Sequence, residues 1–187
     1  GFLSKDGLTA AEMGTALHAF LEHADFARLA AAKAAGTLDA TIPAERDRQV
    51  ALQLTAPEIA EKLDVSRIRR FVEGEAFAKI CAADEVLREL AFITALPAEA
   101  VLAAQGTEGV RAEGEQVLVQ GIADLVLVYP DHLELLDYKT DRRKTAADFV
   151  RAYKPQLDLY ALAVGKRFAP KPVTYKAVSY THLRAHE

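Results

Sequence analysis

The 187-residue sequence contains a single cysteine, Cys81, and no tryptophan. One cysteine excludes a disulfide framework, and it excludes any four-cysteine zinc or iron–sulfur site built within this chain. Aromatic residues make up only 7% of the sequence. A base-stacking platform is therefore not expected to carry the main function.

Long apolar runs and a secretory leader are lacking as well. No stretch approaches the ~18 consecutive apolar residues of a membrane span, and no charged-then-apolar segment opens the chain. Together with the single cysteine, this favours a reducing, cytoplasmic location. With 51% apolar and 27% charged residues, the sequence has the composition of a globular protein, and its length predicts one domain.

Positive charge is scarce in one part of the chain and concentrated in another. Residues 1–138 hold 12 basic and 23 acidic residues, whereas residues 139–176 hold 10 basic and 3 acidic ones. A basic segment on an acidic body can form a face that binds a polyanion. The alternative is that these lysines and arginines only solvate one helix.

Hydrophobic spacing predicts helices over the first two-thirds of the chain. Apolar residues at helical spacing cover 10–29, and Gly36 ends that run. A polar segment follows around Pro43. Thr55 and Glu58 have the spacing of a capping box for a short helix ending near residue 63, and Ser66 is the expected cap of the next helix.

Strand-like sequence begins near Val86. β-rich runs cover 90–96, 121–129 and 133–140, with a weaker one at 101–104 and a last one at 172–178. A helical stripe covers 146–168, and Pro155 within it predicts two helices or a kinked one. The expected fold is α/β, with a mixed central sheet flanked by helices and an N-terminal helical region.

The candidate chemistry lies on the two strongest strands, which are separated by a Pro130-Asp131 turn. A hairpin with a symmetric loop of two or four residues pairs Asp124 with Asp137. Because Pro130 disfavours the primed two-residue turns, we expect the four-residue loop. Directly opposed carboxylates on an antiparallel pair destabilise it.

A cation would make this arrangement tolerable. The expected neighbours on the same face are Ile122, Val126, Leu133 and Leu135, which are all apolar, and buried carboxylates need compensation. Mg²⁺ prefers oxygen ligands, and Lys139, two residues beyond Asp137, could stabilise developing negative charge. Two carboxylates, a divalent metal ion and a lysine are groups that can hydrolyse a phosphodiester. The alternative is a buried Asp–Lys–Asp salt-bridge network.

Two further elements are weak signals when each is taken alone. His18 lies within the first predicted helix, where a lone histidine is more often structural than a metal ligand. Gln156 and Tyr160 share one face of a helix, but a core tyrosine beside a solvated glutamine explains that pair as well.

Five motifs in order resemble a known family. They are Gly14-Thr-Ala-Leu-His18, Arg88-Glu-Leu-Ala-Phe92 with Ala95-Leu-Pro97, Gly121-Ile-Ala-Asp124, Leu136-Asp-Tyr-Lys-Thr-Asp141 and Gln156-x-x-x-Tyr160. The sequence from about Ser4 to Val178 resembles nuclease domains of the RecB/AddA type, a branch of the restriction-endonuclease-like PD-(D/E)xK superfamily. The C-terminal nuclease domains of AddA (RexA) subunits of bacterial helicase–nucleases are the most similar.

The resemblance implies a role for each matching residue. A metal, Mg²⁺ with Mn²⁺ as a substitute, would be bound by His18, Asp124, Asp137 and the main-chain carbonyl of Tyr138. Lys139 would act in catalysis together with the two aspartates. Residues expected to contact DNA or lie beside the site are Glu89, Thr140, Arg142, Gln156 and Tyr160.

The resemblance also implies a biological setting. The activity would be metal-dependent DNA hydrolysis during double-strand break resection. The partners would be single-stranded DNA, the helicase portion of a parent chain and an AddB/RexB-like subunit. An iron–sulfur cluster is excluded by the cysteine count, and no G-x-x-x-x-G-K-[ST] phosphate loop for ATP is present. A catalytically silent module that binds DNA or a partner subunit is the alternative.

The expected division is a helical part, 1–85, contributing His18, a nuclease core, 86–178, and an irregular tail, 179–187. The tail fits neither helical nor strand periodicity, so it is either a native terminus or a segment foreign to the domain.

Overall fold

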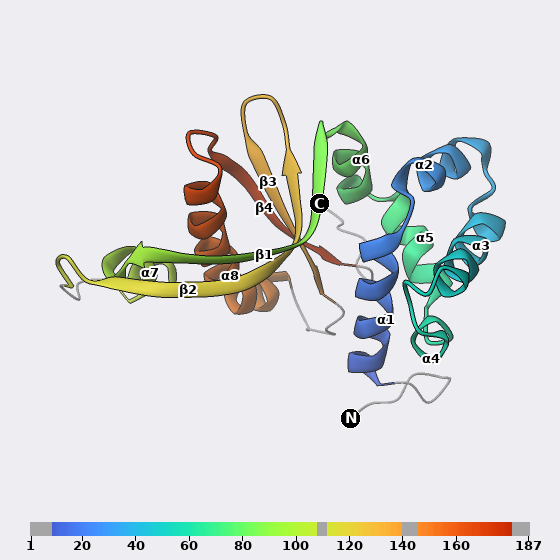
Figure 1. Ribbon diagram of the computed structural model, residues 1–187, viewed down its shortest axis with the longest axis horizontal. Helices are drawn as coiled ribbons and strands as arrows, with labels where there is room; N and C mark the ends of the chain where they lie inside the picture. The colour runs from blue at the N-terminus through green and yellow to red at the C-terminus, as the bar shows by residue number, and fades with distance from the viewer. Residues whose placement is uncertain (1–8, 108–111, 140–145, 181–187) are drawn as a thin grey trace. The chain divides into compact units, whose positions relative to one another are not determined.

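The computed structural model describes residues 9–107, 112–139 and 146–180, and its chain forms two compact units (Figure 1). The first unit contains residues 1–82, 138–142 and 179–187, and the second contains residues 83–137 and 143–178. Thr140, Arg142 and most of the predicted tail lie outside the described residues. Within the described residues, no helix is both long and apolar enough to cross a membrane.

The described part of the first unit is helical. A capping box begins its first helix: the Thr9 hydroxyl accepts a hydrogen bond from the Glu12 amide, and the Glu12 carboxylate accepts one from the Thr9 amide. Asp25 caps a second helix, so the single helix predicted over 10–29 is in fact two. Gly36 ends the second helix at φ 71°, as predicted. The six helices are α1 (Ala10–His23), α2 (Phe26–Ala35), α3 (Leu38–Ala51), α4 (Pro57–Ala60), α5 (Val65–Glu73) and α6 (Glu75–Ala82).

Three local predictions in this unit are wrong. Pro43 lies inside α3 instead of in a polar connection. Thr55 caps no helix, because its hydroxyl is buried and donates to the Gln49 side chain at 3.3 Å. Asp64 caps α5, since its carboxylate accepts a hydrogen bond from the amide of Arg67, while the Ser66 hydroxyl donates to that same carboxylate.

A buried carboxylate joins α1, α2 and α3. The Glu45 side chain is fully buried and accepts hydrogen bonds from the guanidinium groups of Arg28 and Arg48 and from the amide of Asp25. Arg48 also donates to the carbonyl of His23 at 3.1 Å. Burial alone would raise the pKa of Glu45, but these hydrogen bonds outweigh it and hold the pKa below the ordinary glutamate value.

Glu45→Gln should therefore destabilise the helical unit by about 2–4 kcal/mol at neutral pH, because it removes a charge that two arginines require. The folded-state pKa is lowered, so the contribution is fully present above the ordinary pKa and is lost as the pH falls through the folded-state value. Thermal melts from pH 3 to 7 should show the stability gap between the two proteins narrowing toward low pH. A constant gap would contradict the assignment.

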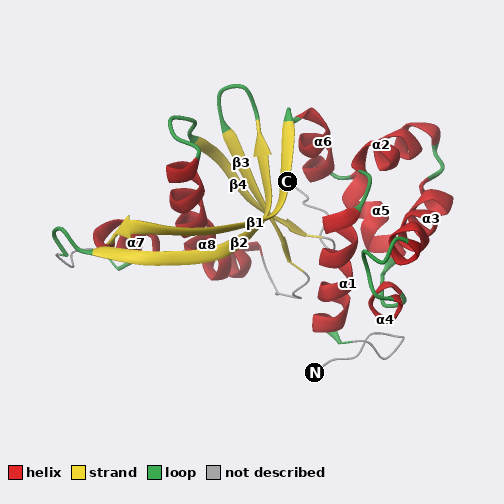
Figure 2. Ribbon diagram, in the orientation of Figure 1, coloured by secondary structure: helices red, strands yellow, loops and turns green. Residues whose placement is uncertain are grey.

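The second unit is built on a four-stranded sheet in the order β1-β2-β3-β4 (Figure 2). The strands are β1 (Glu85–Pro97), β2 (Gln116–Val128), β3 (Leu133–Lys139) and β4 (Val173–Tyr180). β1 with β2 and β2 with β3 are antiparallel, and α8 (Ala146–Arg167) connects β3 to β4. The predicted mixed sheet flanked by helices is confirmed.

Two element predictions here are wrong. Residues 101–104 belong to α7 (Ala98–Ala104), because the alanines of this segment favour a helix. α8 is a single helix that contains Pro155, so the two separate helices that were one of the expectations for 146–168 are not formed.

The predicted β2–β3 hairpin is confirmed. Four residues, 129–132, connect the strands, and the register pairs Val128 with Leu133 and Leu125 with Leu136. The Tyr129 amide donates to the His132 carbonyl at 3.0 Å and closes the loop. This is the register on which the pairing of Asp124 with Asp137 was predicted, but the β2–β3 ladder ends at Leu125 with Leu136 and does not include the two aspartates.

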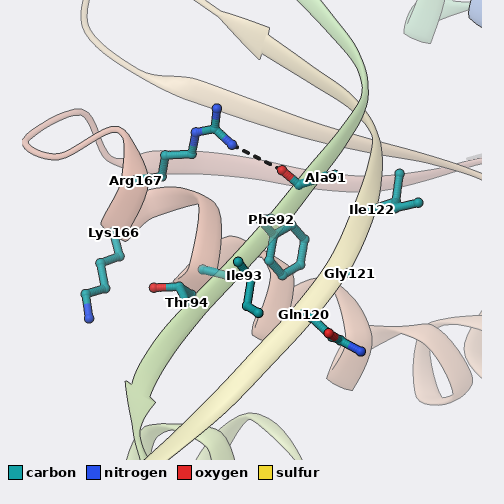
Figure 3. A pocket seen from close by; sticks show the side chains of 10 residues that line it. Ala91, Phe92, Ile93, Thr94, Gln120, Gly121, Ile122, Lys166 and Arg167 are labelled. Carbon is teal, nitrogen blue, oxygen red and sulfur yellow. Dashed lines mark hydrogen bonds between the residues drawn. The ribbon is translucent and has the colours of Figure 1, made fainter.

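The end of α8 lies against the edge of β1 (Figure 3). The Arg167 guanidinium donates to the Ala91 carbonyl at 3.1 Å, and the Lys166 ammonium donates to the Ala95 carbonyl at 2.6 Å. Among the described residues, no strand pairs with β1 on that side. The two side chains therefore satisfy outward carbonyls of an edge strand.

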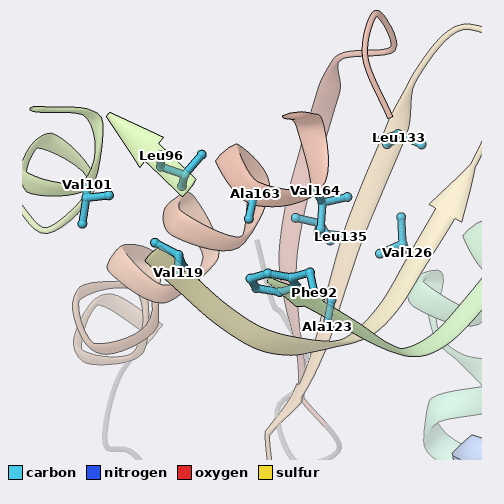
Figure 4. Packing of buried hydrophobic residues seen from close by; sticks show 10 residues of the cluster. All are labelled: Phe92, Leu96, Val101, Val119, Ala123, Val126, Leu133, Leu135, Ala163 and Val164. Carbon is cyan, nitrogen blue, oxygen red and sulfur yellow. The ribbon is translucent and has the colours of Figure 1, made fainter. Parts of the chain in front are cut away.

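The core of this unit lies between the sheet and helices α7 and α8 (Figure 4). Along most of β1 and β2, every second residue faces this core. At one position on each strand the alternation shifts by one residue, and from there on the other set of residues faces the core. Ala123 and Val126, three positions apart, both belong to this core, although regular alternation would place them on opposite faces. The core residues are Phe92, Leu96, Val101, Val119, Ala123, Val126, Leu133, Leu135, Ala163 and Val164.

Candidate functional site

The point where the alternation changes carries two carboxylates. On β1, Arg88 pairs with Leu125 and Leu90 pairs with Ala123, so Glu89 and Asp124 are the intervening residues of the ladder and do not pair regularly. Carboxylate oxygens of Glu89 and Asp124 lie within 4.8 Å of each other. The structure therefore brings Asp124 together with Glu89, which the sequence placed only beside the site.

The backbone at Glu89 is strained. Its φ is 45°, in the left-handed region that non-glycine residues seldom adopt. Such a conformation costs on the order of 1–3 kcal/mol and is found mainly where the surrounding structure holds it for a function. Here it turns the strand so that Leu87 and Leu90 both pack against the core, and it places the Glu89 carboxylate beside Asp124.

This change of phase corrects one sequence-based expectation. Ile122 and Val126 were expected on one apolar face with Asp124. Ile122 is instead 52% exposed, whereas Val126 is completely buried. Asp124 therefore lies at the border between an exposed stretch of β2 and a buried one.

Asp137 is 5% exposed on β3. It is one residue beyond the last pair of the β2–β3 ladder, Leu125 with Leu136. Leu133 and Leu135, at alternate positions of the same strand, both belong to the core. Asp137 thus continues a buried column of β3, where a carboxylate requires compensation.

The residue after Asp137 contacts the predicted histidine. The His18 Nε2 atom lies 3.1 Å from the main-chain carbonyl oxygen of Tyr138. The two rings meet edge to face at 5.7 Å, and Phe71 packs edge to face on the other side of Tyr138 at 5.4 Å. These contacts lie within the first unit. They fix the orientation of the His18 imidazole beside the Tyr138 carbonyl oxygen.

Gln156 and Tyr160 of α8 form a hydrogen-bonded pair that packs against β2 at Gly121. The Gln156 amide donates to the Tyr160 hydroxyl at 3.2 Å, and the Tyr160 ring packs edge to face on Phe92 at 4.9 Å. A Cβ atom at Gly121 would stand 2.8 Å from the Phe92 ring and 2.9 Å from the Tyr160 hydroxyl. Glycine is therefore required three residues before Asp124, because two aromatic rings occupy the space.

Gly121→Ala should destabilise the protein by about 1–3 kcal/mol, because both aromatic rings must shift to admit the methyl group. The matched control is Gly165→Ala in α8, where a new Cβ would meet nothing closer than Val173 at 3.7 Å and helix propensity should raise stability by up to about 1 kcal/mol. Thermal unfolding measures both. Equal melting temperatures for the two variants would show that Tyr160 does not depend on the glycine.

The remaining predicted residues give less information. Lys139 is the last residue of β3 and is partly buried. Thr140 and Arg142 lie outside the described residues.

Within the second unit, the carboxylate oxygens of Glu89 and Asp124 are ligands of the type that a hard divalent cation prefers. Within the first unit alone, the His18 imidazole lies beside the Tyr138 carbonyl oxygen. Among the described residues, oxygen donors dominate, which favours Mg²⁺ or Mn²⁺ over softer metals.

Similarity to known proteins agrees with this chemistry. A family model described as the PD-(D/E)XK nuclease superfamily matches residues 3–186. A Heliobacterium modesticaldum protein, named as the A subunit of an ATP-dependent helicase/nuclease, is 37% identical over 172 residues. That match covers 87% of this chain and 11% of the relative.

Proteins of the same name from other bacteria match in the same way. The Pelotomaculum thermopropionicum protein is 37% identical over 163 residues, covering 86% of this chain and 12% of its own length. The Bacillus mycoides protein is 34% identical over 174 residues, covering 88% and 13%. The chain thus spans about an eighth of the length of these relatives.

Proposed function

Because the chain belongs to the PD-(D/E)XK nuclease superfamily, we propose that it is the Mg²⁺-dependent deoxyribonuclease domain of an ATP-dependent helicase–nuclease that resects double-strand breaks. The observation that carries the proposal is the strained Glu89 backbone, which places its carboxylate beside Asp124. Two like charges held together at the cost of backbone strain require a compensating positive charge, which a bound divalent cation would supply.

In this proposal the ligands are His18, Asp124, Asp137 and the main-chain carbonyl of Tyr138. Glu89, classed by its motif as lying beside the site, adds a carboxylate next to Asp124. A bound divalent ion would supply Lewis-acid stabilisation of the phosphate and a more acidic water. Similarity to the family and the chemistry of the donors support this set.

The chain's own residues would perform the remaining chemistry. Water attacks phosphorus in line, the P–O3′ bond breaks, and the products carry a 5′-phosphate and a 3′-hydroxyl. The Lys139 ammonium would hydrogen-bond the attacking water or a non-bridging oxygen and offset the developing negative charge. Gln156 and Tyr160, held against β2, would orient the substrate, and Thr140 and Arg142 would contact DNA. The helicase portion of a parent chain and an AddB/RexB-like subunit would be its partners.

The proposal is tested by incubating the 187-residue chain with single-stranded DNA and Mg²⁺ or Mn²⁺, with and without a chelator. Cleavage that requires the metal and ignores added ATP is expected, since the sequence has no phosphate loop. DNA binding without cleavage would support the catalytically silent module instead.

A further inference from the structure

An open groove of about 910 Å³ lies within the second unit (Figure 3). Three elements form it: β1, β2 and the end of α8. The lining residues are Ala91, Phe92, Ile93, Thr94, Gln120, Gly121, Ile122, Ala163, Lys166 and Arg167. The exposed residues of this groove belong neither to the hydrophobic core nor to the proposed metal site.

One part of the groove is an exposed apolar surface. Ala91 is paired with Ile122, and Ile93 with Gln120, on adjacent strands. Ile93 is 64% exposed and Ile122 is 52% exposed. Lying on neighbouring strands, the two isoleucines contribute to one exposed apolar patch, and contiguous patches of this kind mark binding sites.

This surface leads directly to the proposed catalytic carboxylates. Ala91 and Ile122 are each two residues from Glu89 and Asp124, respectively, along ladders of constant register. With a rise of about 3.3 Å per residue, Gln120 is about 13 Å along β2 from Asp124. A ligand in the groove would therefore extend from the reacting bond over a few of its neighbouring units.

Lys166 and Arg167 give the groove positive charge. The Lys166 ammonium donates a hydrogen bond to the Ala95 carbonyl, and the Arg167 guanidinium donates one to the Ala91 carbonyl. An ammonium has three donors and a guanidinium five, so both can also donate to a ligand's anionic oxygens. Because their positions are already fixed, little side-chain entropy is lost when they bind.

We propose that this groove binds the single strand of DNA that flanks the scissile phosphate. Lys166 and Arg167 would contact two phosphates, and Ile93 and Ile122 would contact base faces without reading sequence. The inference rests on the proposed function, since it assigns the groove to the same substrate. Positive charge beside an apolar surface, continuous with the carboxylates, matches a polyanion that carries flat apolar bases.

Binding of a fluorescent twelve-nucleotide oligo-dT, measured by anisotropy in EDTA from 50 to 200 mM NaCl, tests the proposal. Lys166→Gln with Arg167→Gln should reduce the slope of log affinity against log salt by about 1.4, because each phosphate contact on a single strand contributes about 0.7. The affinity ratio between wild type and this variant should then shrink about sevenfold over that range. The matched control, Lys33→Gln with Arg46→Gln, removes the same charge from α2 and α3 and should keep the wild-type slope.

A second pair of variants removes the apolar contacts. Ile93→Ser with Ile122→Ser should weaken binding about equally at every salt concentration, whereas Leu52→Ser with Leu54→Ser, two exposed leucines elsewhere, should not. In the cleavage assay, both groove variants should raise KM more than they lower kcat. Thermal melts identify any variant that fails to fold, and single substitutions then replace the pair.

Slopes and KM values equal to those of the controls would overturn the proposal. The same holds if the isoleucine variants bind DNA normally but disrupt association with the rest of a parent polypeptide, because the groove would then be a protein interface. Failure of the proposed function has a different signature: wild type would cleave nothing with any metal, while the salt slope of binding still depended on Lys166 and Arg167.

Discussion

Asp124→Asn should abolish DNA cleavage, with a loss of about 10³-fold or more, and should remove Mn²⁺ binding measured by calorimetric titration. Asparagine keeps the shape of the side chain and removes the charge that the metal needs. Asp137→Asn should behave in the same way. Each substitution also relieves repulsion between carboxylates in the metal-free protein, so the melting temperature without metal should stay the same or rise.

The matched control is Asp131→Asn, in the loop between β2 and β3. That carboxylate is exposed and hydrogen-bonds to the neighbouring His132 imidazole, so metal binding and cleavage should match wild type. His18→Ala should weaken Mn²⁺ binding if the imidazole is a ligand. Wild-type Mn²⁺ affinity in both aspartate variants would refute the shared site.

Lys139→Ala should separate catalysis from metal binding. The ammonium is a charge stabiliser in this proposal and not a ligand, so Mn²⁺ affinity should persist or increase. The cleavage rate should fall by about 10²-fold or more, as for the loss of other electrostatic stabilisers. Single-turnover cleavage at saturating metal, with titration of the same sample, measures both quantities.

Lys33→Ala, an exposed lysine on α2, controls for the loss of one positive charge. A Lys139→Ala protein that cleaves at the wild-type rate would favour the alternative in which Lys139 only neutralises buried aspartates. That alternative also predicts a large loss of stability, which a thermal melt would detect.

The hairpin of β2 and β3 could be predicted because its information is local. The Pro130-Asp131 turn and the apolar runs on each side determine the register, and the structure has that register from Val128 with Leu133 to Leu125 with Leu136. A short loop leaves few alternatives.

The contact of Glu89 with Asp124 could not be predicted in this way. β1 and β2 are separated in the chain by α7 and residues 105–115, so a short turn cannot specify their register. The left-handed backbone at Glu89 is a further obstacle, because glutamate has no preference for it and only the surrounding structure imposes it. The motif around Arg88 and Phe92 located the residue but not its contact.

The predictions of helix caps were wrong for a different reason. Thr55 has the right spacing to Glu58, but tertiary burial gives its hydroxyl a better partner in Gln49. Ser66 lies two residues from Asp64, and the carboxylate caps α5 in its place. Where several short polar side chains compete, local spacing alone does not decide which of them caps.

The interruption of the β1–β2 ladder at Glu89 and Asp124 also divides β2 into two segments, which differ in the number of strands that their backbone pairs with. Residues 125–128 pair with strands on both sides, whereas residues 116–123 pair with β1 alone among the described residues. Amide hydrogen exchange should therefore be slower in 125–128 than in 116–123. The carboxylate pair lies at the boundary between these two segments, so the exchange rates measured along β2 should change at Asp124.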